Sequence, residues 1–289
     1  YIGHISENGA LALAGAGICG PIVTLLTSFG TLVGIGGSIT MGIRMGEKNH
    51  KKAEQVLANS FLMLSIFSVL LTVSFLLLKD KLLMLFGASG ATFPFANTYL
   101  TIYTTGTFFA LMATGLNYFI NCQGFPLVGM FTVLIGAGCN ILLDPIFIFG
   151  FHMGISGAAI ATVISQIFSG ILIIRYLRRY KNGRLTAAHL RPQRTYVSMI
   201  TSLGAAAFFN QLAMLVVQIV LNKSLTYYGA HSDYGESIPL ACAGIITKVN
   251  QVFFSIVIGL SQGMQPIASF NYGAKNYARV RQMLSQKRR

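Results

Sequence analysis

Asp144 is one of only seven acidic residues in a chain of 289, and it lies inside the apolar run NILLDPIFIF at residues 140–149. Asn140 precedes it by four residues, which places the amide and the carboxyl group on the same face of a helix. Pro145 follows directly and has no backbone N–H, so the carbonyl of Ile141 loses its helical partner. These oxygen atoms suit a hard cation such as Na⁺, and the carboxyl group also suits a relay for H⁺.

The alternative interpretation of Asp144 is structural: its carboxylate caps the helix break at Pro145 and is bonded to Asn140 alone. Thr162 and Gln166, four residues apart in the next apolar segment, offer further oxygens and favour the functional interpretation. A charged side chain inside a membrane span costs about 3 kcal/mol or more, so it usually faces a cavity or a partner. Desolvation favours the neutral form of a carboxyl group, which enables it to take up and release a proton.

Lys248, in AGIITKVNQ, is the only cation placed well inside an apolar segment. It is either a cavity charge that pairs with a carboxylate or a substrate anion, or a lysine that extends toward the membrane surface. Gln218 and Gln251 are further candidates for a polar cavity, although polar residues also bond helices to one another in lipid.

Other kinds of chemistry find little support in the sequence. The glycine-rich stretch GIGGSITMG at 34–42 lies inside an apolar run without a preceding strand or a following Lys-Ser/Thr, so close helix packing explains it better than phosphate binding. The five histidines and four cysteines are scattered without metal-ligand spacing, and no hydrolytic triad is evident. We therefore expect no enzyme activity, no cofactor, no metal other than possible Na⁺ at Asp144, and an ion gradient as the energy source.

The composition indicates an integral membrane protein. The chain is 54% hydrophobic and 10% charged, with a mean hydropathy of +0.65, whereas soluble domains carry roughly 25% charged residues. Its apolar runs are continuous rather than alternating, which predicts an all-α membrane fold and not a barrel.

Because about 20 apolar residues cross the hydrocarbon core, the sequence predicts about seven complete transmembrane helices. Residues 1–5 look like the tail of an earlier helix, and tyrosines such as Tyr99, Tyr103 and Tyr196 fall near the expected ends, as in an aromatic belt. The predicted spans are 12–43, 56–78, 95–120, 126–149, 157–179, 196–227 and 238–271.

The net charge of +14 follows membrane topology rather than nucleic-acid binding. Seventeen of the 21 Lys and Arg residues fall at 44–52, 175–194 and 275–289, each time after a long apolar segment. The positive-inside rule makes such loops cytoplasmic. We expect a multi-pass protein of the cell (inner or plasma) membrane, surrounded by the lipid bilayer, with no nucleic-acid partner.

An internal repeat relates residues 1–58 to residues 228–285 at a constant offset of 227. Hydrophobicity does not force its polar part, in which Gly46, Lys48 and Asn49 correspond to Gly273, Lys275 and Asn276. A parallel repeat predicts two pseudo-symmetric six-helix lobes, an arrangement typical of secondary transporters.

The repeat divides the chain into three regions. Residues 1–180 form the amino-terminal lobe, residues 181–195 are a cytoplasmic linker between lobes, and residues 196–289 begin the carboxy-terminal lobe. The chain is then a fragment that lacks most of helix 1 and helices 9–12.

The stretches NILLDPIFIFG, GISGAAIATVISQ and QPIASFNYGAKNYARV resemble those of the multidrug and toxic compound extrusion (MATE) family, and the likeness covers essentially the whole chain. The resemblance implies twelve helices in two lobes that rock between inward-open and outward-open states. It implies export of organic cations and other amphipathic drugs in exchange for Na⁺ or H⁺. It assigns the coupling-ion site to Asn140, Asp144 and Thr162, together with a helix 1 carboxylate that this chain does not contain.

The prediction is therefore a monomeric multidrug antiporter, with Lys248, Gln166, Gln251 and Gln218 as possible cavity or substrate contacts. A flippase for lipid-linked oligosaccharides, from the same superfamily, is the alternative. It would need a basic cavity for pyrophosphate, and Lys248 is the only visible candidate. A membrane enzyme acting on lipids would need a nucleophile or a metal cluster at the interface.

Overall fold

The computed structural model describes residues 1–5, 9–179, 185–186, 189–231 and 237–286, and within these ranges every regular element is helical. The elements are η1 (Ile2–His4), α1 (Gly9–Gly46), α2 (His50–Leu85), α3 (Phe93–Thr105), α4 (Thr107–Cys122), α5 (Pro126–Pro145), η2 (Ile146–Gly150), α6 (Gly154–Arg179), α7 (Arg194–Ala230), α8 (Ser237–Gly273) and α9 (Tyr277–Gln286). Residues 1–5 thus contain a 3-10 turn.

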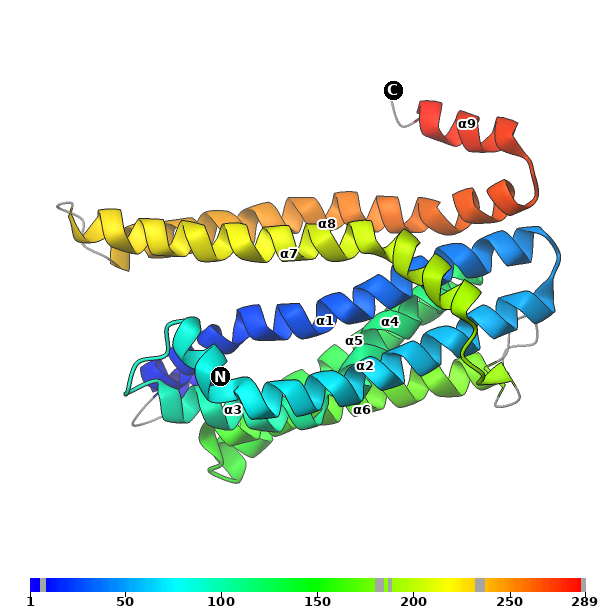
Figure 1. Cartoon of the computed structure of the whole chain (residues 1–289). Helices are drawn as coiled ribbons and strands as arrows, with labels where there is room; N and C mark the ends of the chain where they lie inside the picture. Colours follow the sequence, from blue (N-terminus) through cyan, green and yellow to red (C-terminus); the bar gives the residue numbers. More distant parts are fainter. Residues whose placement is uncertain (6–8, 180–184, 187–188, 232–236, 287–289) are drawn as a thin grey trace.

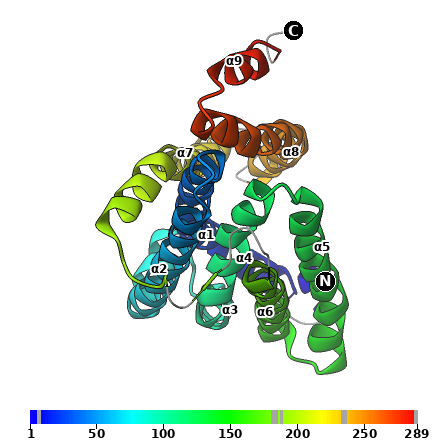
Figure 2. The ribbon, with the colours of Figure 1, turned by 90° about the vertical axis from the view of Figure 1, so that its right-hand side faces the viewer.

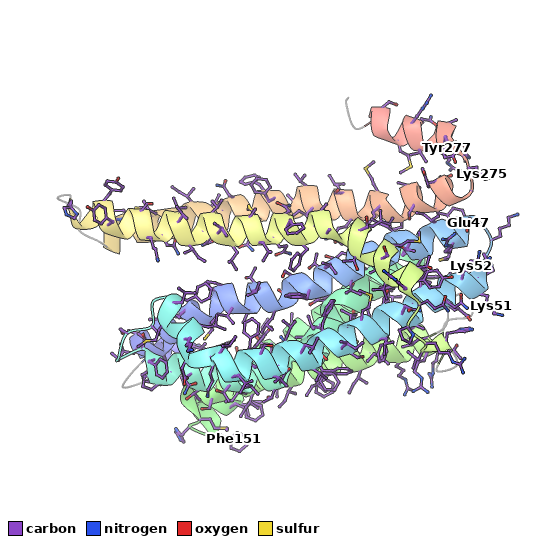
Figure 3. The ribbon with its side chains drawn as sticks, in the orientation of Figure 1. Glu47, Lys51, Lys52, Phe151, Lys275 and Tyr277 are labelled. Atoms are coloured by element: carbon purple, nitrogen blue, oxygen red, sulfur yellow. The ribbon has the colours of Figure 1, made fainter. Side chains whose placement is uncertain are left out.

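Six helices of the described ranges are long and apolar enough to cross a membrane. They are Gly9–Gly46, His50–Leu85, Pro126–Gly150, Gly154–Arg179, Arg194–Gly229 and Cys242–Gly273. Lys51, Lys52 and Lys275 lie at one end of this bundle, which we call the basic end, and Phe151 lies at the opposite end (Figure 3).

The predicted span at 95–120 is not one continuous helix, because α3 ends at Thr105 and α4 begins at Thr107. With 13 and 16 residues, each is shorter than the roughly 20 residues of a straight crossing. Gly106 separates them, and the hydroxyls of Thr105 and Thr107 donate to carbonyls three residues earlier, a bond that bends helices.

The core surrounds α1, which packs against α2, α3, α4, α7 and α8. Toward the basic end, α1, α2 and α4 share one buried cluster that includes Val33, Leu57 and Phe119. Toward the other end, Ile22 and Leu26 of α1 pack with residues of α2 and α3 in a second cluster. Figures 1 and 2 show α7 and α8 lying together on one side of the other helices.

The glycines of α1 provide close contacts to three helices, as the sequence predicts for residues 34–42. A side chain at Gly34 would overlap the backbone of Gly115 on α4. Gly36 meets the backbone of α7 at Ile200, and Gly42 meets Ser269 of α8. Small residues allow these backbones to approach closely.

The repeat is visible in the backbone. Lys48, after α1, and Lys275, after α8, have φ angles of 58° and 59°. Asn49 and Asn276 each accept, through the side-chain oxygen, an N–H from three residues ahead. Helices α2 and α9 begin at His50 and Tyr277, which also differ by the offset of 227.

Candidate functional site

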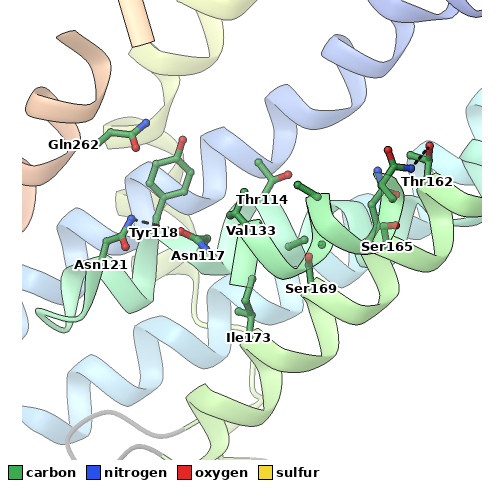
Figure 4. Close-up of a pocket in the computed structure, with 15 residues that line it drawn as sticks. Thr114, Asn117, Tyr118, Asn121, Val133, Thr162, Ser165, Ser169, Ile173 and Gln262 are labelled. Carbon is green, nitrogen blue, oxygen red and sulfur yellow. Dashed lines mark hydrogen bonds between the residues drawn. The ribbon is translucent and has the colours of Figure 1, made fainter. Parts of the chain in front are cut away.

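A cavity of about 430 Å³ opens between α4, α5 and α6, and one residue of α8 completes its lining (Figure 4). Its lining is amide, hydroxyl and apolar, and it contains no charged side chain among the described residues. The lining residues are Ala113, Thr114, Asn117, Tyr118, Asn121, Val133, Gly136, Ala137, Asn140, Thr162, Ser165, Gln166, Ser169, Ile173 and Gln262.

The structure brings together three of the residues predicted for the ion site. The side-chain N–H of Asn140 donates to the Asp144 carboxylate at 3.2 Å and to the Thr162 hydroxyl oxygen at 3.4 Å. Thr162 in turn donates to the carbonyl of Ala158 at 2.9 Å. Asn140 and Thr162 line the cavity, and Asp144 lies one helical turn beyond Asn140. We call Asn140, Asp144 and Thr162 the polar triad.

The backbone changes form directly after Asp144. Helix α5 ends at Pro145 and continues as the π-helix η2, in which the N–H of Phe151 donates to the carbonyl of Ile146 at 2.9 Å. Short π-helical segments are frequent at functional sites. Gly157 of α6 lies against the backbone of Phe147, where any side chain would overlap it, so α6 is held close to the end of α5.

Gln166 also lines the cavity, and it is anchored by a residue that the sequence placed elsewhere. Its side-chain N–H donates to the Tyr103 hydroxyl at 3.1 Å. Tyr103 is only 3% exposed, so its assignment to an aromatic belt is wrong. The same is true of Tyr196, which is buried and donates to Gln55 at 3.0 Å. Buried hydroxyls need such partners, and these tyrosines find them on α6 and α2.

A row of polar contacts that the sequence reasoning missed joins α4, α5 and α6. Asn117 donates to the Thr132 hydroxyl at 3.1 Å, and Asn121 donates to Asn117 at 3.5 Å. Ser169 donates to the carbonyl of Thr132 at 3.0 Å. The signal in the sequence was the pair Asn117 and Asn121, four residues apart within an apolar segment.

Two of the predicted cavity residues are not brought to this site. Gln218 on α7 and Gln251 on α8 are exposed and line none of the described pockets. Lys248 belongs to α8, and its side chain lies outside the described part of the structure. Their roles as cavity contacts stay predictions.

Toward the basic end, α1 and α8 cross just beyond the cavity. The side-chain N–H of Gln265 donates to the Ser38 hydroxyl at 3.2 Å. One turn further, Gly42 contacts Ser269, and one more turn on, Gly46 contacts the backbone of Phe270 and Gly273 contacts that of Ile43. Only a space of about 10 Å³ remains at this place, bordered by Tyr118, Asn121 and Gln262 of the cavity lining.

The crossing pairs are equivalent positions of the repeat. Ser38 and Gln265 differ by 227, as do Gly42 and Ser269, and Gly46 and Gly273. In a two-fold interface, residue i of one copy meets residue j of the other and the reverse contact also occurs. The reciprocal contacts of Gly46 and Gly273 have this form, so α1 and α8 cross on a pseudo-two-fold axis. We call this place the axial crossing.

The chain is similar to known membrane transporters over nearly its whole length. The family model described as MatE matches residues 1–146 and 206–287. The multidrug export protein MepA of Staphylococcus haemolyticus is 32% identical over 254 residues, which is 87% of this chain and 54% of that protein. MepA of Staphylococcus aureus is 27% identical over 290 residues, which is 98% of this chain and 61% of that protein.

Solved structures agree in fold. A crystal structure of MATE in the bent conformation has a TM-score of 0.87 and 24% identity, covering 96% of this chain and 61% of that one. A MOP superfamily transporter from Pyrococcus furiosus has a TM-score of 0.87 at 22% identity. This chain spans 54% to 61% of the length of the two MepA proteins. Because the family match covers most of the sequence, the chain belongs to the MatE family of multi-pass membrane transporters, which are not enzymes.

Proposed function

We propose that the whole protein is a secondary antiporter that exports amphipathic or cationic drugs in exchange for H⁺ or Na⁺. The observation that carries the proposal is the polar triad, which places one carboxylate at the end of a cavity whose described lining has no other charge. The similarity to two proteins named as multidrug export proteins supports the same function.

The triad accounts for ion coupling as follows. Asn140 is a donor to Asp144 and Thr162, so it fixes the carboxylate and the hydroxyl oxygen close together. A Na⁺ ion would take ligands from these oxygens, whereas H⁺ would bind the Asp144 carboxylate itself. Either ion neutralises the Asp144 carboxylate and so lowers the cost of its desolvation. The ion-bound form of the protein therefore tolerates burial of this group, whereas the ion-free form favours its exposure to water.

The cavity indicates the chemistry of the exported compound. The side-chain N–H of Gln166 donates to Tyr103, whereas its side-chain oxygen is buried and has no hydrogen-bond partner among the described residues. This oxygen is an acceptor for an N–H donor, such as a protonated amine, within a largely apolar lining. An amphipathic cation satisfies both features.

The axial crossing supports alternating access by two rocking lobes. Residues 1–180 would move as one lobe, residues 196–289 would belong to the other, and residues 181–195 would link them. With the basic end in the cytoplasm, the crossing closes the cytoplasmic side, and α7 and α8 diverge from α1 toward the external side in Figure 1. This arrangement corresponds to an outward-facing state.

The whole protein in proteoliposomes tests the proposal. Efflux of a fluorescent organic cation is followed under an imposed pH gradient and, separately, under an imposed Na⁺ gradient. We expect export under one gradient, which then identifies the coupling ion. If correctly folded protein exports nothing under either gradient, the antiporter proposal is wrong, and transport of a lipid-linked oligosaccharide becomes the next assay.

Thr162→Val should weaken coupling because it removes one acceptor of Asn140 at nearly constant volume. The loss of one hydrogen bond is worth about 1 kcal/mol, so we expect the apparent affinity for the coupling ion to fall roughly fivefold. Thr162→Ser keeps the hydroxyl and should stay within twofold of the wild type. Equal ion affinities in the valine and serine variants would contradict this role for Thr162.

Gln166→Leu should change substrate preference rather than coupling. We expect affinity for a protonated amine to fall roughly tenfold, since a charge-assisted hydrogen bond is lost. Affinity for tetraphenylphosphonium, which has no N–H group, should change little. Gln282→Leu, at an exposed position of α9 that lines none of the described pockets, is the matched control. An equal loss for both compounds would show that Gln166 has only a structural role.

A further inference from the structure

A second large pocket lies at the carboxyl end of α6, apart from the cavity of the polar triad. Its volume is about 490 Å³, and its described lining residues are Ile171, Ile174, Arg175, Arg178 and Arg179. It therefore combines apolar and cationic side chains, and neither the ion site nor the drug cavity makes use of them.

The lining forms a single stripe along α6. Ile171, Arg175 and Arg178 are four and three residues apart, which places them on one face of the helix. Phe168 continues the stripe in the other direction, and it and Ile171 are about half exposed. At 1.5 Å per residue, the stripe runs about 10 Å from Ile171 to Arg178. Its apolar part lies within a membrane-spanning helix, and its arginines lie at the basic end.

The arginines have no acidic partner among the described residues. The two ion pairs at this end join Arg44 to Glu47 and His189 to Glu54, and neither involves α6. Arg175 and Arg178 are exposed, so both guanidinium groups are available to a ligand. A guanidinium group binds phosphate oxygens through two parallel N–H donors.

From this arrangement we propose that the α6 pocket binds an anionic phospholipid of the cytoplasmic leaflet. The phosphate group contacts Arg175, Arg178 and Arg179, and the acyl chains lie along Ile171 and Phe168. Charge complementarity selects an anionic headgroup, and the apolar continuation of the stripe selects a lipid over a soluble phosphate. Basic pockets on the cytoplasmic side of membrane helices commonly bind such headgroups.

Native mass spectrometry of the purified whole protein tests this site with phosphatidylglycerol, phosphatidylcholine and inorganic phosphate as probes. We expect phosphatidylglycerol to bind more tightly than phosphatidylcholine, and inorganic phosphate to compete poorly. Arg175→Gln/Arg178→Gln should weaken phosphatidylglycerol binding about tenfold and leave phosphatidylcholine binding unchanged. Arg191→Gln/Arg194→Gln removes the same charge from exposed residues that line no described pocket, and should change binding less than about twofold.

Two outcomes would overturn the lipid site. One is unchanged phosphatidylglycerol binding in Arg175→Gln/Arg178→Gln, and the other is effective competition by inorganic phosphate. If the glutamine variant fails to fold, Arg175→Lys/Arg178→Lys replaces it in the binding measurement. This variant retains the charges but loses the two parallel N–H donors of each guanidinium group. Mapping of a photo-crosslinking phosphatidylglycerol on the wild type gives an independent readout: crosslinks should fall within residues 168–179, and crosslinks only elsewhere would refute the proposal.

Discussion

Asp144→Asn should reduce ion-driven drug export to the level of vesicles without protein. The substitution keeps the size of the side chain and its hydrogen bond to Asn140, but it removes the group that takes up a proton or charge-balances Na⁺. The cost of a charged group inside the membrane also disappears, so expression and thermal stability should be retained or improved.

The measurement is efflux of a fluorescent organic cation from proteoliposomes under the gradient that drives the wild type. Asp80→Asn is the matched control, because Asp80 is exposed at the end of α2, outside the polar triad. The control should export at the wild-type rate. Ion-driven export by Asp144→Asn would exclude Asp144 as the coupling residue and, with it, the mechanism that we propose.

Gly46→Leu should open the axial crossing and abolish transport. A side chain at Gly46 would overlap the backbone of Phe270. The neighbouring atoms all belong to the backbone, so they cannot rotate aside as the end of a side chain can. Overpacking costs about 1–3 kcal/mol, which changes the ratio of the two conformations roughly fivefold to more than a hundredfold. Spin-label distances across the basic end should therefore increase. Gly20→Leu, at a position of α1 where a side chain meets open space, should leave them unchanged.

A reversible crosslink tests the same crossing by holding it closed, whereas Gly46→Leu opens it. Ser38→Cys/Gln265→Cys replaces two hydrogen-bonded side chains by thiols. Oxidation to a disulfide should stop transport, and reduction should restore it. Cys122 donates to the carbonyl of Ser38 at 3.1 Å, so the pair requires a background in which Cys122 is replaced by serine. Full transport by the oxidised pair would show that the crossing does not open during the cycle.

The local part of the site could be predicted from the sequence. Asn140 and Asp144 are four residues apart in an apolar run, and both helical geometry and the cost of burying charge apply directly to such a pair. The axial crossing was also within reach, since the repeat offset already pairs Gly46 with Gly273. Thr162 was a candidate for its hydroxyl oxygen in the next apolar segment, and the resemblance assigned it to the ion site. Its contact with Asn140, over 22 residues, depends on how α5 and α6 pack.

The contacts between distant segments could not be predicted in this way. Tyr103 and Gln166 are 63 residues apart, and only the packing of α3 on α6 joins them. A tyrosine near the end of an apolar run is typical of a membrane interface, so the sequence pattern favoured the wrong environment. The break at Gly106 was missed for a related reason. A hydropathy value averaged over a whole segment does not reveal a single glycine, and the close approach of Val163 to this position is a property of the folded protein.

In evolutionary terms, the axial crossing ties the two copies of a duplicated sequence to each other. At the crossing, Ser38 and Gly42 meet their own duplicates, while Gly46 and Gly273 meet Phe270 and Ile43, which are duplicates of each other. A larger side chain in one copy therefore requires a small partner in the other. Gly42 beside Ser269 and Ser38 beside Gln265 are such unequal pairs, and Gly46 with Gly273 is the pair in which both copies have glycine. Compensating substitutions in this protein should therefore occur at a fixed separation of 227 residues.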